Sequence, residues 1–403
     1  MLVKYFVRPK ISFYKKNIFK VKSGDIYQFI FIATYILFLF HSGGIYQTKL
    51  IPTVLLILLP VIFLPLVIFF TKRSFYLLFF LALVLRLLMI FASPNPKIDV
   101  YTMLKEAPTV LLQGINPYQA VFSSVYSGVT ADYFTYWPLS FLIQIPFVLI
   151  FHDPRVLLIV ADISAAWLLF LISNRSNSGQ LLTLIYLFRP NTNFIIEQSF
   201  LTPMEFLFFI SIVFFLKYRE NNSGISSKFF PGIFAGLLSA VKPHYAFLLF
   251  LLFKKNFRQT AAGFLLPIIF LVSPFFFWNQ KAFVSDTAGY FLKPAAELFY
   301  VPINLSLNIN SLINVLTGKT IPYLYTIFIL ILIWGALYYI FTKNFNFIIQ
   351  NNGNKFREDF VLASIIFLLT FYLTQRFAFI NYYYFTGSLI ILWLILNLQG
   401  VKR

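Results

Sequence analysis

The stretch FYLLFFLALVLRLLMIFASPNPKIDVYTMLKE, residues 75–106, joins a long apolar run to a segment rich in polar and turn residues. Its first part, 75–92, approaches the length of about 20 apolar residues that a membrane-spanning helix needs. The chain then carries Asp99 and the neighbouring pair Lys105 and Glu106, and the turn Gly-x-Asn-Pro-Tyr follows before residue 119. A loop that leaves a membrane needs only to be soluble. A carboxylate and several turn residues at this point therefore indicate a functional segment.

Composition extends the membrane prediction to the whole chain. Of its 403 residues, 60% are hydrophobic and 11% are charged, whereas soluble domains carry about 25% charged residues. The remaining polar residues could not cover a soluble core of that size. Because the apolar runs are continuous and do not alternate, they predict helices and argue against a β-barrel. We expect an all-α polytopic membrane protein with about 12 to 14 transmembrane or half-membrane helices.

The formal charge of +19 is scattered between the apolar runs. This distribution is typical of loops that orient a membrane protein and argues against a nucleic-acid partner. The chain has no Cys, which excludes disulfides and thiolate metal sites, and its three His argue against a histidine metal site. We therefore expect no metal and no cofactor.

The order of basic residues predicts a topology. Residues 1–22 are basic and contain no acid, so we assign them to a cytoplasmic tail and 23–403 to one transmembrane domain. With spans near 26–41, 51–70 and 75–92, residues 93–135 become an exoplasmic loop of short amphipathic helices. A second exoplasmic loop is predicted at 279–320. Further apolar segments lie near 136–151, 180–190, 203–217, 259–278, 321–342, 360–375 and 382–399.

The basic clusters between the later segments conflict with single crossings, because all of them would prefer the cytoplasm. They are Arg155, Arg175, 217–228 and 254–258. The conflict disappears if segments 155–173 and 230–253 are hairpins of two short half-helices, with tips at Asp162 and at Lys242-Pro243. Proline breaks a helix, and a lysine is costly in lipid. Two ordinary spans with a weak charge bias are the alternative.

Asp99 is the candidate catalytic residue. It follows the membrane end of a span by about two helical turns, and a carboxylate there can act as general base on a hydroxyl. It also precedes the helical run VYTMLKEA, so it could cap that helix instead.

Four basic residues are predicted near the exoplasmic face, where they could bind the phosphate of a donor: Lys242, Arg376, His244 and Arg189. Snorkelling toward lipid head groups is the alternative for each of them. Six further residues are candidates for contacting a sugar or an acceptor: Tyr118, Tyr136, Trp137, Asn116, Glu197 and Asp162. The aromatic residues could instead form an interfacial belt, and the two acids could form structural salt bridges.

Several stretches in order resemble the GT-C superfamily of integral-membrane glycosyltransferases, and most closely the polyprenyl-phosphate-mannose-dependent mannosyltransferases. They are KIDVYTMLKEAPTVLLQGINPY, YWPL, RVLLIVADISAAWLL, LFRPNTNFIIEQSFLTPMEFLFF, GIFAGLLSAVKPHYAFLLF, NLSLNINSL and RFAFINYYYF. The likeness spans roughly residues 75–399. The chain departs from the pattern in its two spans before the one that leads to Asp99, in Tyr-Trp-Pro-Leu where Tyr-Pro-Pro is commoner, and in Asn381-Tyr382 where His-Tyr is frequent.

The resemblance implies a GT-C-like fold and transfer of a sugar from a polyprenyl-phosphate-linked donor to a lipid or glycan acceptor. Mannose is the first candidate for this sugar. It implies an active site on the exoplasmic face, inversion, Asp99 as the base, and Lys242 and Arg376 at the donor phosphate. We expect a monomer surrounded by membrane lipids. The alternatives are a transporter or flippase for a lipid-linked sugar and a non-catalytic membrane subunit. A transporter would share ionisable residues within the membrane but commonly shows internal repeats, which this chain lacks.

Overall fold

The structure is a computed structural model that describes residues 23–128, 130–218, 226–252, 257–290, 306–319, 321–348, 353–375 and 377–400. Helices make up most of these residues. No strand occurs among them, apart from one isolated bridge between Phe122 and Ala131. The prediction of an all-α chain is therefore confirmed for this part of the protein. The predicted basic tail 1–22 and Arg376 lie outside the described residues.

Five helical stretches are long and apolar enough to cross a bilayer. They are α2 (Leu50–Ile68), α3 (Lys72–Ala92), α7 (Arg155–Ile172), the stretch Arg258–Trp278, and Ile380–Leu398 within α20 (Ile380–Gly400). Their lengths match the hydrocarbon thickness of about 30 Å, which supports an integral membrane protein. The described residues also form shorter apolar helices, so the total of 12 to 14 membrane elements stays a prediction.

The remaining helices of the first half are α1 (Ser23–Phe40), α4 (Asp99–Leu112), η1 (Pro117–Gln119), α5 (Leu139–Leu142), α6 (Ile145–Phe151), α8 (Asn177–Leu187), α9 (Thr192–Glu197) and α10 (Thr202–Tyr218). Those of the second half are α11 (Ser226–Ser239), η2 (Pro243–Phe247), α12 (Leu248–Leu252), α13 (Phe257–Pro267), η3 (Ile268–Val272), α14 (Ser273–Trp278), α15 (Gln280–Val284), η4 (Ser285–Gly289), α17 (Ile309–Thr317), α18 (Tyr323–Ile348) and α19 (Gly353–Thr374). The predicted second loop, 279–320, thus contains α15, η4 and α17 in its described parts.

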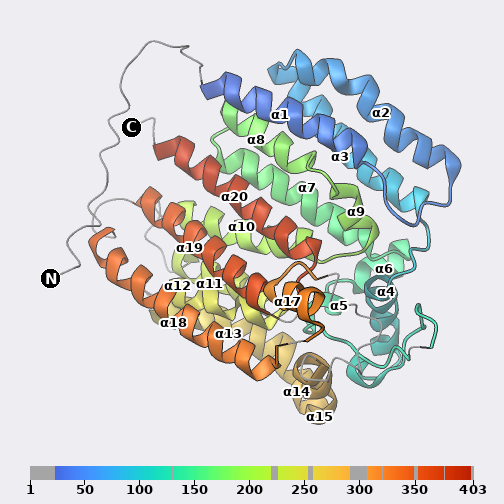
Figure 1. Ribbon diagram of the computed structural model, residues 1–403, viewed down its shortest axis with the longest axis vertical. Coiled ribbons are helices and arrows are strands. Elements are labelled where there is room, and N and C mark those ends of the chain that lie inside the picture. Colours follow the sequence, from blue (N-terminus) through green and yellow to red (C-terminus); the bar gives the residue numbers. More distant parts are fainter. Residues whose placement is uncertain are drawn as a thin grey trace.

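The long helices lie side by side, with α2 against α3, α7 against α10 and α19 against α20 (Figure 1). The short helices α4, α5, α6 and α9 gather at one end of this bundle, on the right of the view (Figure 1). We call this the α4 end. Helix α20 starts near it and finishes at the opposite end.

The boundaries of α3 bring Asp99 to the α4 end. Thr71 caps the start of α3, because its hydroxyl accepts the Ser74 N–H at 3.2 Å while the Ser74 hydroxyl accepts the Thr71 N–H at 3.1 Å. The helix ends at Ala92, before the prolines of the segment SPNP. Helix α4 then begins at Asp99 and buries one face. The prediction of a short amphipathic helix in this loop is confirmed.

The predicted hairpin at 155–173 is wrong. Residues Arg155–Ile172 form one continuous helix, α7, and Asp162 lies in its middle and not at a tip. The preceding segment, 136–151, does not form a span either. It makes only the short helices α5 and α6, which pack on α4 at the α4 end. The seven residues of α6 cover about 10 Å, which is too short to cross a bilayer.

Arg155 consequently lies at the α4 end, beside the segment that leads to Asp99, and not at the opposite end as predicted. Its guanidinium donates to the Ser93 carbonyl oxygen at 2.6 Å and to Asp153 at 2.6 Å. Its charge is therefore neutralised locally. The loop-charge rule counts each Lys and Arg whatever its partners, so it assigned a side to Arg155 although this arginine is buried and paired within the protein.

The predicted break in segment 230–253 is confirmed. Helix α11 ends at Ser239, the chain turns through Lys242-Pro243, and α12 lies back against α11 and α13. Gly232 and Gly236 let α11 approach α13 closely, as in small-xxx-small helix pairs. A Cβ on Gly236 would lie 2.4 Å from the Phe264 carbonyl oxygen. This contact fixes the helix that ends beside Lys242.

Candidate functional site

Asp99 is the first residue of α4, and its carboxylate faces tyrosines of the loop 120–138. Oδ2 accepts the Tyr133 hydroxyl at 2.9 Å, and Oδ1 accepts the Val100 N–H at 2.8 Å and a longer contact from the Tyr126 hydroxyl at 3.4 Å. The position before the helix is occupied by Ile98, which makes no side-chain cap. Asp99 itself accepts one N–H of the first turn of α4, that of Val100, through Oδ1, while Oδ2 accepts the Tyr133 hydroxyl.

Burial raises the pKa of Asp99 above its usual value, while the hydrogen bonds from Tyr133 and Val100 lower it in part. Among the described residues, no Lys or Arg forms an ion pair with this carboxylate. Burial and the charge of Asp99 both raise the pKa of Tyr126, and this charge also contributes to the raised pKa of Tyr46. Asp99 is thus a half-buried acid among neutral tyrosines, and a raised pKa suits a general base.

Lys242 lies at the break after α11 and is paired with a residue that the sequence analysis did not single out. Its Nζ lies 2.7 Å from Oε1 of Glu205, and both side chains are buried. The other oxygen of Glu205 accepts the Tyr245 hydroxyl at 2.6 Å. The Nζ also lies over the Tyr382 ring, 4.8 Å from its centroid. The charge of Lys242 is therefore already balanced inside the bundle.

Tyr136 lies beside Lys242 of the Lys242–Glu205 pair. Burial raises the pKa of its hydroxyl, and the charges of both Asp99 and Glu205 raise it further. Its ring faces the Lys242 ammonium, 5.7 Å from the centroid. The backbone N–H of the neighbouring Trp137 donates to the Val241 carbonyl oxygen at 3.0 Å. The loop after Asp99 is thus attached to the break that carries Lys242, and the two groups share one end of the bundle.

Asn116 and Tyr118 support this loop from beneath. The Asn116 side chain accepts the Tyr118 N–H at 3.1 Å, and the Tyr118 hydroxyl donates to the Tyr136 carbonyl oxygen at 2.8 Å. Both side chains are buried, and the Tyr118 ring packs edge-on against Phe134 and Phe283. They hold Tyr136 in place and do not form an open stacking surface.

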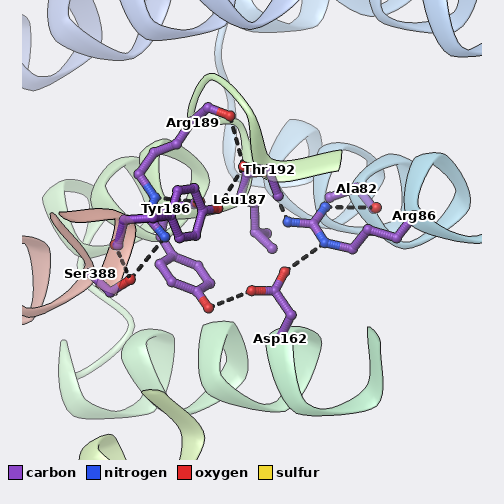
Figure 2. Close-up of polar contacts among 9 residues, drawn as sticks. Ala82, Arg86, Asp162, Tyr186, Leu187, Arg189, Thr192 and Ser388 are labelled. Carbon is purple, nitrogen blue, oxygen red and sulfur yellow. Dashed lines mark hydrogen bonds and ion pairs between the residues drawn. The ribbon is translucent and has the colours of Figure 1, made fainter. Parts of the chain in front are cut away.

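Asp162 belongs to a closed network in the middle of the bundle (Figure 2). One carboxylate oxygen pairs with Arg86 Nε at 2.6 Å, and the other accepts the Tyr186 hydroxyl at 2.5 Å. Arg86 also donates to the carbonyl oxygens of Ala82 and Leu187. Asp162 and Arg86 are almost fully buried. This carboxylate joins α3, α7 and α8, so its role is structural.

Arg189 lies just after α8 and is half-buried. It donates to the Tyr384 carbonyl oxygen and the Ser388 hydroxyl, each at 2.9 Å (Figure 2). Its guanidinium stacks over the Tyr384 ring, 3.7 Å from the centroid. No carboxylate among the described residues pairs with it. Arg189 therefore keeps its charge and stays a candidate phosphate ligand.

Glu197 is a buried acid that fixes the loop between α1 and α2. It accepts the backbone N–H groups of Ile45 at 2.6 Å and Tyr46 at 2.8 Å. A Cβ at Gly44 would lie 2.3 Å from the Glu197 carboxylate, so a larger residue there would have to displace this side chain. Burial and the charge of Glu197 raise the pKa of Tyr46, and the charge of Asp99 adds a smaller contribution. Glu197 thus holds the loop that carries Tyr46.

His244 stacks on Phe371, with 4.7 Å between ring centroids, and next to Tyr245. It lies beside Lys242, as the sequence placed it. Within the described part of the chain, no three His, Cys, Asp or Glu residues lie close enough to hold a metal ion.

Sequence reasoning missed Glu205, Arg86 and Tyr133. Glu205 and Arg86 carried a usable signal, since ionisable residues inside apolar runs are functional or structural by default. Tyr133 carried none, because a tyrosine in an aromatic loop is not distinctive. No protein-family model matches the chain, and no curated protein is significantly similar to it.

Proposed function

We propose that this protein transfers a sugar from a polyprenyl-phosphate-linked donor to a hydroxyl acceptor, with mannose as the first candidate sugar and Asp99 as the general base. The observation that carries the proposal is the Asp99 carboxylate. Asp99 is half-buried and lies at the start of α4, shortly after the apolar span that ends at Ala92. It has no cationic partner among the described residues, and burial raises its pKa. Glu197 also lacks a cationic partner among the described residues, but its two oxygens accept backbone N–H groups that hold a loop, whereas the charge of Asp162 is balanced by Arg86.

The reaction is a single displacement. The acceptor hydroxyl gives its proton to Asp99 Oδ2 or Oδ1 while its oxygen attacks the anomeric carbon. The bond from that carbon to the phosphate oxygen breaks, and polyprenyl phosphate leaves with the electron pair. One displacement inverts the anomeric centre. Tyr133 and the Val100 N–H hold the carboxylate for this step, and water exclusion around it favours proton transfer.

The leaving phosphate needs a cation. Lys242 lies next to Tyr136, in the loop that follows Asp99, but Glu205 already balances its charge. Phosphate binding at Lys242 would therefore have to displace or share Glu205. Arg189 has no acidic partner among the described residues and is the more available cation. Arg376 lies outside the described residues, so its assignment stays a prediction.

The test is a transfer assay with protein purified in detergent, using polyprenyl-phosphate-mannose and its glucose and arabinose counterparts. We expect transfer from one of these donors to a lipid or glycan acceptor, and no transfer by D99N. Movement of the intact donor across a vesicle membrane without transfer would instead favour the flippase alternative. Equal activity of D99N and the unmodified protein would remove Asp99 from the mechanism.

A further inference from the structure

An open groove runs along the outside of the bundle at the α4 end. It has a volume of about 740 Å³ and lies where the start of α2 meets the end of α3. Its walls are apolar except at the mouth, and they consist of Lys49, Leu50, Ile51, Pro52, Ile90, Phe91, Pro94 and Asp153. We propose that this groove binds a membrane lipid with an anionic phosphate head group, whose chain lies on α2 and α3 and whose phosphate contacts Lys49. The inference goes beyond the proposed function and does not depend on it.

The position of the groove favours a lipid. Both α2 and α3 are long and apolar enough to span the bilayer, so a groove between them opens toward hydrocarbon. Ile51 is 74% exposed and Phe91 is 64% exposed. Exposed apolar side chains on helices that span a bilayer face its hydrocarbon. The groove lies at the end of these helices, which is where a head group would meet the interface.

The charge at the mouth favours an anion. Lys49 is exposed, and no carboxylate among the described residues pairs with it. Asp153, on the other wall, is neutralised by the Arg155 guanidinium at 2.6 Å and 2.9 Å. The mouth therefore carries one uncompensated positive charge, which complements a phosphate head group.

The backbone around Lys49 is fixed although its side chain is free. The N–H groups of Thr48 and Lys49 both donate to the Ala92 carbonyl oxygen, at 2.9 and 3.2 Å. This places the ammonium next to the end of α3. Two buried cations of the bundle differ in this respect, since Arg86 is balanced by Asp162 and Lys242 by Glu205. The backbone of Lys49 is thus held by the end of α3, while its ammonium group has no acidic partner among the described residues.

A head group at Lys49 would lie close to the loop that Glu197 holds. Tyr46 precedes Lys49 by three residues, which span at most about 11 Å of extended chain, and the Glu197 carboxylate accepts the Tyr46 N–H at 2.8 Å.

The test measures lipid binding and not sugar transfer, so its failure is distinct from a failure of the proposed function. The full chain is delipidated in detergent and titrated with phosphatidylglycerol or with phosphatidylcholine of the same chains, and native mass spectrometry counts the bound lipids. We expect tighter binding of phosphatidylglycerol. K49A should weaken it about five-fold, the contribution of one interfacial lysine, and should weaken phosphatidylcholine binding less, because the choline cation offsets the charge of that phosphate.

Two matched controls locate the lipid. K97A removes another exposed lysine from the same end of the bundle and should change nothing. I90W narrows the groove and should weaken both lipids, whereas I62W, on an exposed part of α2 outside the groove, should not. Equal loss in K49A and K97A, equal affinity for both lipids, or full binding by I90W would each overturn the proposal.

Discussion

Asp99 and Asp162 are two acids that each accept a tyrosine hydroxyl, from Tyr133 and from Tyr186 respectively. They differ in their cations. Asp162 pairs with Arg86 at 2.6 Å in the middle of the bundle, and together they tie three helices (Figure 2). Asp99, at the α4 end, has no such pair among the described residues. The Asp162 carboxylate is paired with a cation, whereas the Asp99 carboxylate accepts hydrogen bonds from neutral groups only among the described residues.

This difference suits the two carboxylates to different roles, Asp162 to stabilising the fold and Asp99 to catalysis. A buried ion pair loses much stability when one partner is removed, because a charge is left without compensation. A carboxylate with a raised pKa and neutral neighbours is a poor way to stabilise a fold but a suitable base. The comparison therefore predicts opposite phenotypes for the same substitution at the two positions.

The largest effect is expected for D99N on transfer. Loss of a general base typically lowers the rate about 10²- to 10⁴-fold. The fold should persist, since burial raises the pKa of Asp99 and so disfavours its ionised form. Ionisation of this group costs stability as pH rises through the raised pKa, and D99N removes that cost at neutral pH. We expect an unfolding temperature equal to or slightly above that of the unmodified protein.

Both readouts are needed for D99N, kcat for the transfer reaction and the unfolding temperature in detergent. If transfer and thermal stability fall together, Asp99 is structural, and its contrast with Asp162 disappears.

The second effect is expected for D162N on stability. Arg86 would keep its charge inside the bundle without a counter-ion, which should cost about 3–5 kcal/mol. Thermal unfolding and yield after solubilisation measure this loss. The double variant R86M/D162L should recover most of it, because apolar residues of similar volume replace such pairs with little cost. A D162N protein that unfolds normally but fails in transfer would instead place Asp162 in the chemistry.

Much of the fold follows from the sequence, because apolar runs of span length can do little else in a chain with 11% charged residues. The break at Lys242-Pro243 was predictable from proline and a lysine within an apolar run. The error at 155–173 has a physical cause. Asp162 was interpreted as an interruption of the helix, yet Arg86 neutralises it from another helix. A pairing between residues 76 positions apart leaves no trace in local sequence.

The candidate site was predictable in part. Asp99 stands out by position, and the structure adds the tyrosines that hold it. The pairing of Lys242 with Glu205 was not foreseen, since it joins α10 to the break after α11. Asn116 and Tyr118 were expected to face a sugar and instead support the loop from inside. Sequence indicates which residue types are unusual in a span, whereas the packing decides which of them remain available.

The smallest effect, and the sharpest test of the contrast, is expected for Y133F. The Tyr133 hydroxyl lowers the pKa of Asp99, so its removal should let that pKa rise further. The base form is then lost at a higher pH, and the acidic limb of the kcat/KM profile should move toward neutral. One hydrogen bond contributes about 0.5–1.5 kcal/mol, which corresponds to a loss of about two- to ten-fold at acidic pH and to less at neutral pH. The matched variant Y186F removes the hydroxyl from Asp162 and should leave the pH profile unchanged, because Asp162 belongs to the network with Arg86 in the middle of the bundle and not to the surroundings of Asp99. A shift of the limb in Y186F, or none in Y133F, would mean that Asp99 does not set the acidic limb.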